Sequence, residues 1–69
     1  MGGEKLSDIG DKIKSERLNK SLKQKQLAVR AGISISYMSD IERGRTIPSI
    51  QTLKKISDAL NIKVSKLID

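Results

Sequence analysis

The segment KQKQLAVRAGISISYMSDIERG, residues 23–44, constrains the fold more than any other part of this chain. Apolar residues recur at helical spacing on both sides of a short break, and each helical stretch is followed by a glycine. Gly32 and Gly44 stand where left-handed helix stops are expected, and Ser34 stands where a second helix would begin. The segment therefore predicts two short amphipathic helices joined by a tight turn.

The first of these helices is predicted over residues 24–31 and the second over residues 35–43. The inward face of the first is formed by Gln24, Leu27, Ala28 and Ala31, at i, i+3, i+4 and i+7. Lys23 stands at its N-cap position and is a poor cap. In the second helix, Ile33 is expected to pack as a hydrophobic staple on Met38. The inward face of the second helix is formed by Tyr37, Met38 and Ile41.

A helix over residues 7–19 is predicted before this segment. Ser7 is its N-cap, and Ile9 and Ile13 form its inward stripe. Leu6 precedes the stripe, and Leu18 and Leu22 are expected to close on the core. Gly10 weakens the helix slightly.

Two helices are predicted after the segment. The first covers residues 50–60, begins after Pro48-Ser49 and ends at Asn61. Its inward residues are Ile50, Leu53, Ile56, Ala59 and Leu60. The last covers residues 64–68 and presents Val64, Leu67 and Ile68. With no strand pattern or repeat in the sequence, the fold class is all-α: five short helices around one aliphatic core.

Composition narrows the chemistry. The 69 residues make one small domain, and the absence of Cys and His excludes disulfides, thiolate metal sites and imidazole ligands. No cofactor is expected, and the dispersed carboxylates form no catalytic constellation, so an enzyme is not expected. No stretch is apolar enough to cross a bilayer or resembles a signal peptide. We therefore expect a cytoplasmic protein with no membrane partner.

The net charge of +6 is concentrated on and before the paired helices. Residues 12–45 hold nine Lys or Arg against three Asp or Glu, whereas residues 1–11 carry a net charge of −2 and residues 46–69 a net charge of +2. A polyanion is the natural partner for such an arrangement. The alternative is a solvated face that only keeps the protein soluble. The position of the excess charge favours the polyanion.

The outward face of the second helix suggests how DNA would be read. It carries Ile35, Ser36, Ser39, Asp40 and Arg43. Serine can exchange hydrogen bonds with several bases, Ile35 can pack on a thymine methyl group, and Asp40 can accept from cytosine N4. For Ile35 and Ser36 we favour base contact over a solvated face. For Asp40 we favour a solvated or paired carboxylate.

Phosphate contacts are expected at the start of the first helix of the pair. A helix N-terminus favours anions, and Lys23 and Lys25 flank Gln24 there. The Gln24 side chain has a second interpretation, in which it braces the following helix. Arg43 and Arg45, on either side of Gly44, form another candidate phosphate clamp or are merely solvated.

Arg17 and Glu42 are interpreted as a structural pair. Arg17 follows Ile13 at i+4, and Glu42 follows Met38 at i+4, so each places a charge on an otherwise inward stripe. Mutual pairing at the edge of the core accounts for both charges.

Together these residues resemble the phage-repressor and Cro-like (XRE-type) helix-turn-helix family, over about residues 9–68. The resemblance is carried by Gln24, Leu27, Ala28, Ala31, Gly32, Ile33, Ser34, Ile41, Glu42, Arg43, Gly44 and Pro48-Ser49. It implies a compact five-helix lambda-repressor-like DNA-binding domain over residues 7–69, with residues 1–6 as a flexible N-terminus. It also implies that the second helix of the pair enters the major groove.

The resemblance assigns roles to individual residues. It places base readout at Ile35, Ser36, Ser39 and Asp40, and phosphate contacts at Lys23, Gln24, Tyr37, Arg43 and Arg45. It also implies the Arg17–Glu42 pair. The family commonly has Ser or Thr where this chain has Lys23, and often Arg or Gln where it has Ile35. Specificity is therefore expected to depend partly on DNA shape and dimer spacing.

The expected function is a sequence-specific double-stranded DNA-binding transcriptional regulator, with a repressor favoured. Family members usually bind as homodimers, and the candidate interface here is Ile62, Val64, Leu67 and Ile68, although some of these four must fill the core. The alternative is a protein-interaction module on the same fold, an antitoxin-like or coactivator-like partner, because a fold does not dictate function.

Overall fold

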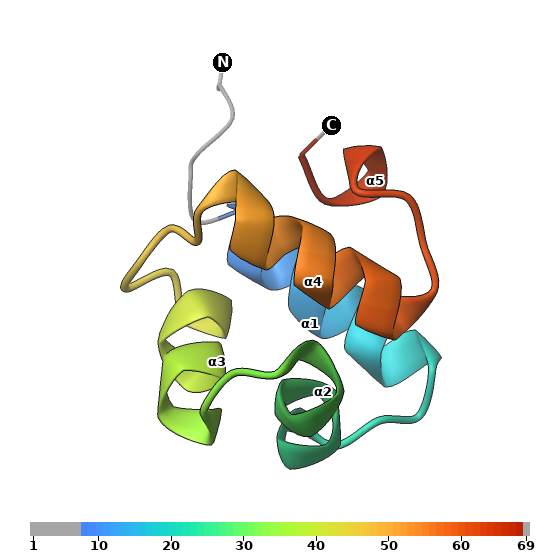
Figure 1. The fold of residues 1–69 in the computed structure, drawn as a ribbon, viewed down its shortest axis with the longest axis horizontal. Coiled ribbons are helices and arrows are strands. Elements are labelled where there is room, and N and C mark those ends of the chain that lie inside the picture. Colours follow the sequence, from blue (N-terminus) through green and yellow to red (C-terminus); the bar gives the residue numbers. More distant parts are fainter. Residues whose placement is uncertain (1–7, 69) are drawn as a thin grey trace.

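The computed structural model describes residues 8–68 as five α-helices around one core (Figure 1). In chain order they are α1 (Asp8–Asn19), α2 (Gln24–Ala31), α3 (Ile35–Glu42), α4 (Ile50–Leu60) and α5 (Ser65–Ile68). This part of the chain contains no strand, and the predicted all-α class is confirmed. The predictions for residues 1–6 and for Ser7 as an N-cap lie outside the described residues.

The helices end close to where glycine and asparagine predicted. Gly32 and Asn61 adopt the expected left-handed stops, with φ of 73° and 60°. Helix α3 ends one residue earlier than predicted, because Arg43 forms its C-cap and Gly44, with φ of 77°, turns the chain away. Ser21, between α1 and α2, also has a positive φ of 57°, which was not predicted.

Serine side chains begin α3 and α4, whereas α2 begins differently. The Ser34 hydroxyl accepts the backbone N–H of Tyr37 at 3.0 Å, and Ser49 plays the same part in α4. Lys23 has no acceptor atom and makes no side-chain capping bond. Instead, Gln26 Oε1 accepts the backbone N–H of Lys23 at 2.8 Å. This bond orients the start of α2, but no side chain caps the N–H groups of its first turn.

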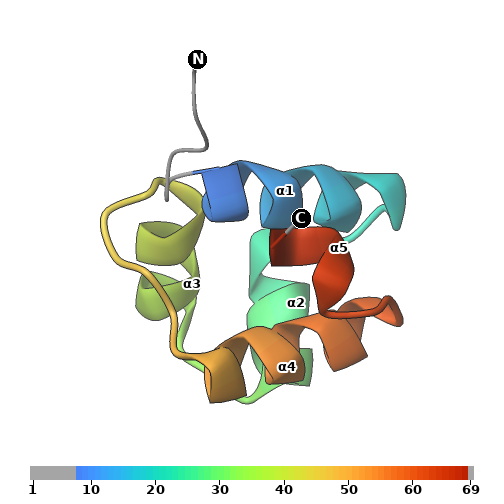
Figure 2. The ribbon, with the colours of Figure 1, turned by 90° about the horizontal axis from the view of Figure 1, so that it is seen from above.

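The core is aliphatic and draws on all five helices. Its buried members are Ile13, Leu22, Leu27, Ala28, Ala31, Met38, Ile41, Leu53, Ile56, Leu60 and Leu67. Helix α2 packs mainly against α4, and α1 packs mainly against α3. Figure 2 shows α3 at one end of the molecule, beside one end of α1. The core thus supports α2 and α3 from one side and leaves their other faces open.

Two residues predicted to face inward are exposed. Leu18 is 57% exposed. The inward row of α1 is Ile9, Ile13 and Arg17, and Leu18, which follows Arg17, lies about 100° away from that row around the helix axis. Of Leu18 and Leu22, only Leu22 is buried in the core. Ile50 is 63% exposed because it is the first residue of α4, where the Cβ points back beyond the end of the core.

Gly10 is buried where α1 passes the end of α3. A Cβ at this position would collide with the backbone carbonyl oxygens of Ile41 and Glu42. Glycine therefore allows the backbone of α1 to rest directly on the last turn of α3. The close approach offsets the lower helix propensity of glycine and sets the position of α3 relative to the core.

Candidate nucleic-acid interface

The outer face of α3 is open over its first turn. Ile35 is 45% exposed and Ser36 is exposed. Ser39 and Asp40, one turn further along, are partly buried. The structure thus keeps the four predicted base-reading residues on one helix, with the two nearest its start the most accessible. The short serine side chains let a ligand approach the helix closely.

Asp40 lies beside Arg45 from the loop that follows α3. The Arg45 Nη1 and Asp40 Oδ1 atoms are 4.0 Å apart, and the two side chains are 67% and 48% exposed. The backbone N–H of Arg45 also donates to the Asp40 carbonyl oxygen at 2.9 Å. An exposed ion pair of this length contributes little stability, but it keeps a cation close to the end of α3. The paired carboxylate agrees with the interpretation favoured for Asp40.

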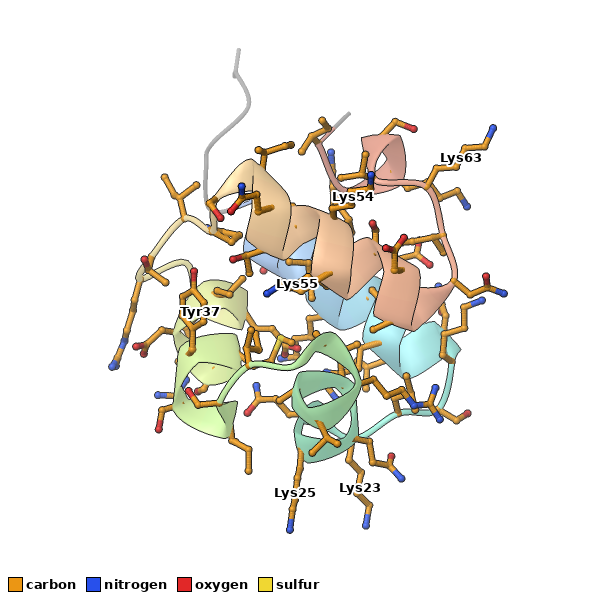
Figure 3. The ribbon with its side chains drawn as sticks, in the orientation of Figure 1. Lys23, Lys25, Tyr37, Lys54, Lys55 and Lys63 are labelled. Carbon is orange, nitrogen blue, oxygen red and sulfur yellow. The ribbon has the colours of Figure 1, made fainter. Side chains whose placement is uncertain are left out.

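Cationic side chains stand at the start of α2 and just after the end of α3, and a Gln24–Glu42 hydrogen bond joins these two helix ends at one corner of the molecule. Lys23 and Lys25 are exposed and point away from the body of the molecule, whereas Lys63 lies at the opposite edge (Figure 3). Arg43 and Arg45 are exposed just after α3. The first-turn N–H groups of α2 lie at the same corner, and they add to its positive potential. The corner is therefore suited to an anion.

A buried hydrogen-bonded network joins this corner to α1. Arg17 Nε donates to Glu42 Oε2 at 2.8 Å, and the second terminal nitrogen of Arg17 donates to Glu42 Oε1 at 3.0 Å. The remaining terminal nitrogen of Arg17 donates to the Leu22 carbonyl oxygen at 2.9 Å. The two charged side chains are only 10% and 3% exposed. The pair predicted between Arg17 and Glu42 is thus present as a two-bond fork.

Gln24 extends this network to α2. Its Nε2 donates to Glu42 Oε1 at 3.2 Å, so the side chain braces α3 as the second interpretation of Gln24 supposed. Glu42 accepts hydrogen bonds from side chains on two other helices. Sequence reasoning missed the Leu22 carbonyl as an acceptor and Gln26 as a reciprocal cap. A glutamine at the third position of α2 is the only sequence signal for the latter.

Tyr37 and the candidate dimer residues are more buried than their proposed roles suggest. Tyr37 is half-buried and packs against the core from α3 (Figure 3). Leu67 is fully buried, so it is one of the candidate residues that fill the core, and it is not available to an interface. Ile62 and Val64 are partly buried against the core, and Ile68 is 47% exposed.

The described part of the chain offers no other obvious chemistry. Among residues 8–68 no group of three His, Cys, Asp or Glu side chains is placed to hold a metal ion. No helix within the same range has the length and apolar character needed to span a membrane.

Comparison with known proteins places this geometry in a family. The family model described as helix-turn-helix matches residues 13–67. The immunity repressor protein of Bacillus phage phi105 is 45% identical over 60 residues, which are 87% of this chain but 42% of the repressor. This chain therefore spans less than half of that relative's length.

Solved structures share the fold. The N-terminal DNA-binding domain of SinR from Bacillus subtilis superposes with a TM-score of 0.86 at 42% identity, covering 91% of this chain and 93% of the domain. SinR, the master regulator for biofilm formation, in complex with DNA gives a TM-score of 0.84 at 45% identity, covering 88% of this chain and 98% of that one. The open face of α3, its cationic corner and these matches agree, and the chain belongs to the helix-turn-helix family.

Proposed function

We propose that this chain binds double-stranded DNA in a sequence-specific way, with α3 in the major groove, and that it regulates transcription as a repressor. The observation that carries the proposal is the open first turn of α3, on the same pair of helices as exposed cations and an α2 N-terminus without a side-chain cap. The likeness to SinR in its DNA complex, and to a phage immunity repressor, supports the same function.

The proposed role of each side chain follows from its position on the surface. Ile35 and Ser36 contact base edges, and Ser39 and Asp40 lie one turn further along the same face. Phosphates are bound by residues around the edges of this face: Lys23, Gln24, Tyr37, Arg43 and Arg45. Asp40 holds Arg45 near the duplex, or it accepts a hydrogen bond from cytosine N4. Because Ile35 offers no hydrogen bond, apolar contact with thymine methyl groups contributes to specificity.

The bound form is proposed to be a homodimer. Two recognition helices related by a two-fold axis would contact half-sites about 34 Å apart on one face of the duplex. Ile68 is the most exposed member of the candidate interface, with Ile62 and Val64 at its margin. Such a protein acts where the DNA is, in the bacterial cytoplasm.

In-vitro selection of bound duplexes from a random DNA pool, at near-physiological salt, tests the proposal. We expect a two-fold symmetric consensus, and an affinity for it that falls steeply with salt because phosphate binding releases counterions. A chain that enriches no sequence, or binds all duplexes equally, contradicts sequence-specific regulation. Retention of a protein partner by that same chain would support the interaction-module alternative.

A further inference from the structure

Glu42 connects the buried ion pair to the proposed DNA-binding surface. Its Oε1 atom accepts from Arg17 at 3.0 Å and from Gln24 Nε2 at 3.2 Å. Arg17 is held in turn by the Leu22 carbonyl oxygen. Glu42 itself is buried, with its side chain 3% exposed, so a DNA backbone passing over α3 would not contact it.

Gln24 is the member of this network that reaches the surface. It is the first residue of α2 and partly buried, and exposed lysines stand on both sides of it. A side-chain amide carries two N–H donors and one carbonyl acceptor. A carboxylate only accepts, so it can hold the nitrogen of the amide but would repel its oxygen. The bond to Glu42 therefore selects one of the two orientations of the amide.

From this arrangement we propose that Glu42 is a positioning residue for DNA binding and acts through Gln24. One N–H of the Gln24 amide is bound to Glu42, and the other remains available to a phosphate oxygen together with the first-turn N–H groups of α2. In the absence of Glu42 the amide rotates freely and turns its oxygen toward the phosphate in part of the population. The inference rests on the proposed function, because Gln24 is one of the residues proposed there to bind phosphate.

A double-mutant cycle on DNA affinity tests the coupling. The probe is the tightest duplex recovered by the selection, and dissociation constants are measured by fluorescence anisotropy at one salt concentration. Gln24→Ala, Glu42→Gln and the double variant are compared with the parent, at a temperature where circular dichroism shows each to be folded. We expect about a tenfold loss for Gln24→Ala, a severalfold loss for Glu42→Gln, and no further loss when Glu42→Gln is added to Gln24→Ala.

Lys23 provides the matched control. It stands beside Gln24 at the start of α2, and its backbone hydrogen bonds go to the Gln26 side chain and to the Leu27 N–H, not to Glu42. In the double variant of Lys23→Ala and Glu42→Gln, the fold-losses of DNA affinity of the two single variants should therefore multiply. If Glu42→Gln does not fold, Glu42→Asp replaces it, because it retains the charge for Arg17 and withdraws the oxygens from Gln24.

The possible outcomes separate the two proposals. Non-additive losses in the Gln24 cycle together with additive losses in the Lys23 cycle support the positioning role. A parent that binds its duplex while both cycles are additive overturns the positioning role alone. A parent that prefers no duplex overturns the proposed function and this inference with it. The proton shifts of the Gln24 amide, followed by NMR without DNA, should change in Glu42→Gln, and unchanged shifts would count against the inference.

Discussion

At Gly10 the absence of a side chain matters more than the helix propensity of the residue. Sequence reasoning treats a glycine inside a helix as a weakness of up to about 1 kcal/mol relative to alanine. In the fold, the same position is the contact between the backbone of α1 and the last turn of α3. The two effects have opposite signs, and the steric one is the larger.

Gly10→Ala should therefore destabilise the domain. Overpacking of a close contact typically costs about 1–3 kcal/mol, which exceeds the gain of about 1 kcal/mol from propensity. Urea unfolding followed by circular dichroism measures the change. Ser15→Ala, at an exposed position of the same helix, is the control and should leave stability unchanged or slightly higher. A Gly10→Ala variant more stable than the parent would rule out the close contact.

Substitutions at two residues would separate the proposed base reading from the proposed phosphate binding. Ser36 is exposed on the open turn of α3, whereas Lys23 precedes α2. Ser36→Ala should change the selected consensus at one position in each half-site. Lys23→Ala should weaken all duplexes alike and lower the slope of log affinity against log salt by about 1. Selection and salt titration of both variants check this, and a changed consensus for Lys23→Ala would contradict the assigned roles.

At the scale of the elements, one buried network fixes three helices relative to one another. Arg17 comes from α1, Gln24 from α2 and Glu42 from α3. Every buried side-chain polar atom in the described residues has a hydrogen-bond partner. Because the partners satisfy one another, removal of any one leaves a buried donor or charge without its counterpart.

Glu42→Ala should lose stability before it loses sequence preference. Breaking a buried ion pair from one side costs about 3–5 kcal/mol. That is a large part of the roughly 3–10 kcal/mol expected for a domain of this size. Thermal unfolding should show a sharply lower midpoint, while selection below that midpoint should return the parental consensus. Ser36 is unaffected, since it is exposed at the start of α3, more than a turn and a half of helix from Glu42. A variant that melts like the parent would contradict the structural role of the pair.

At the scale of the whole molecule, the proposed dimer interface depends on an exposed apolar residue of α5. Ile68 is 47% exposed on α5, and Leu18 is 57% exposed on α1. Only the first belongs to the proposed dimer interface. Substitution of either residue by lysine adds the same charge, so a difference between the two variants reports on the interface and not on electrostatics.

Ile68→Lys should leave the fold intact but weaken binding to a duplex with two half-sites. Its affinity for a duplex with one half-site should be similar to that of Leu18→Lys. Sedimentation of each protein with each duplex measures both stoichiometry and affinity. Equal binding of the two variants to the two-half-site duplex would remove Ile68 from the interface.

The helices, the residues that end them and the family could be predicted from the sequence, because these features depend on residues close together in the chain. Helical spacing placed Met38 and Ile41 in the core, and Ser34 and Gly32 at helix ends. The Arg17–Glu42 pair was also predictable, since each charge interrupts an apolar row.

The packing of the helices sets which apolar residues remain exposed to water and which backbones touch, and sequence patterns do not show this packing. Periodicity alone could not show that Leu18 and Ile50 face solvent or that Leu67 is buried, because each lies near a helix end. The burial of such a residue depends on whether another helix extends far enough to cover it. The contact at Gly10 joins residues more than 30 positions apart in the chain, and a local sequence pattern cannot predict such a contact.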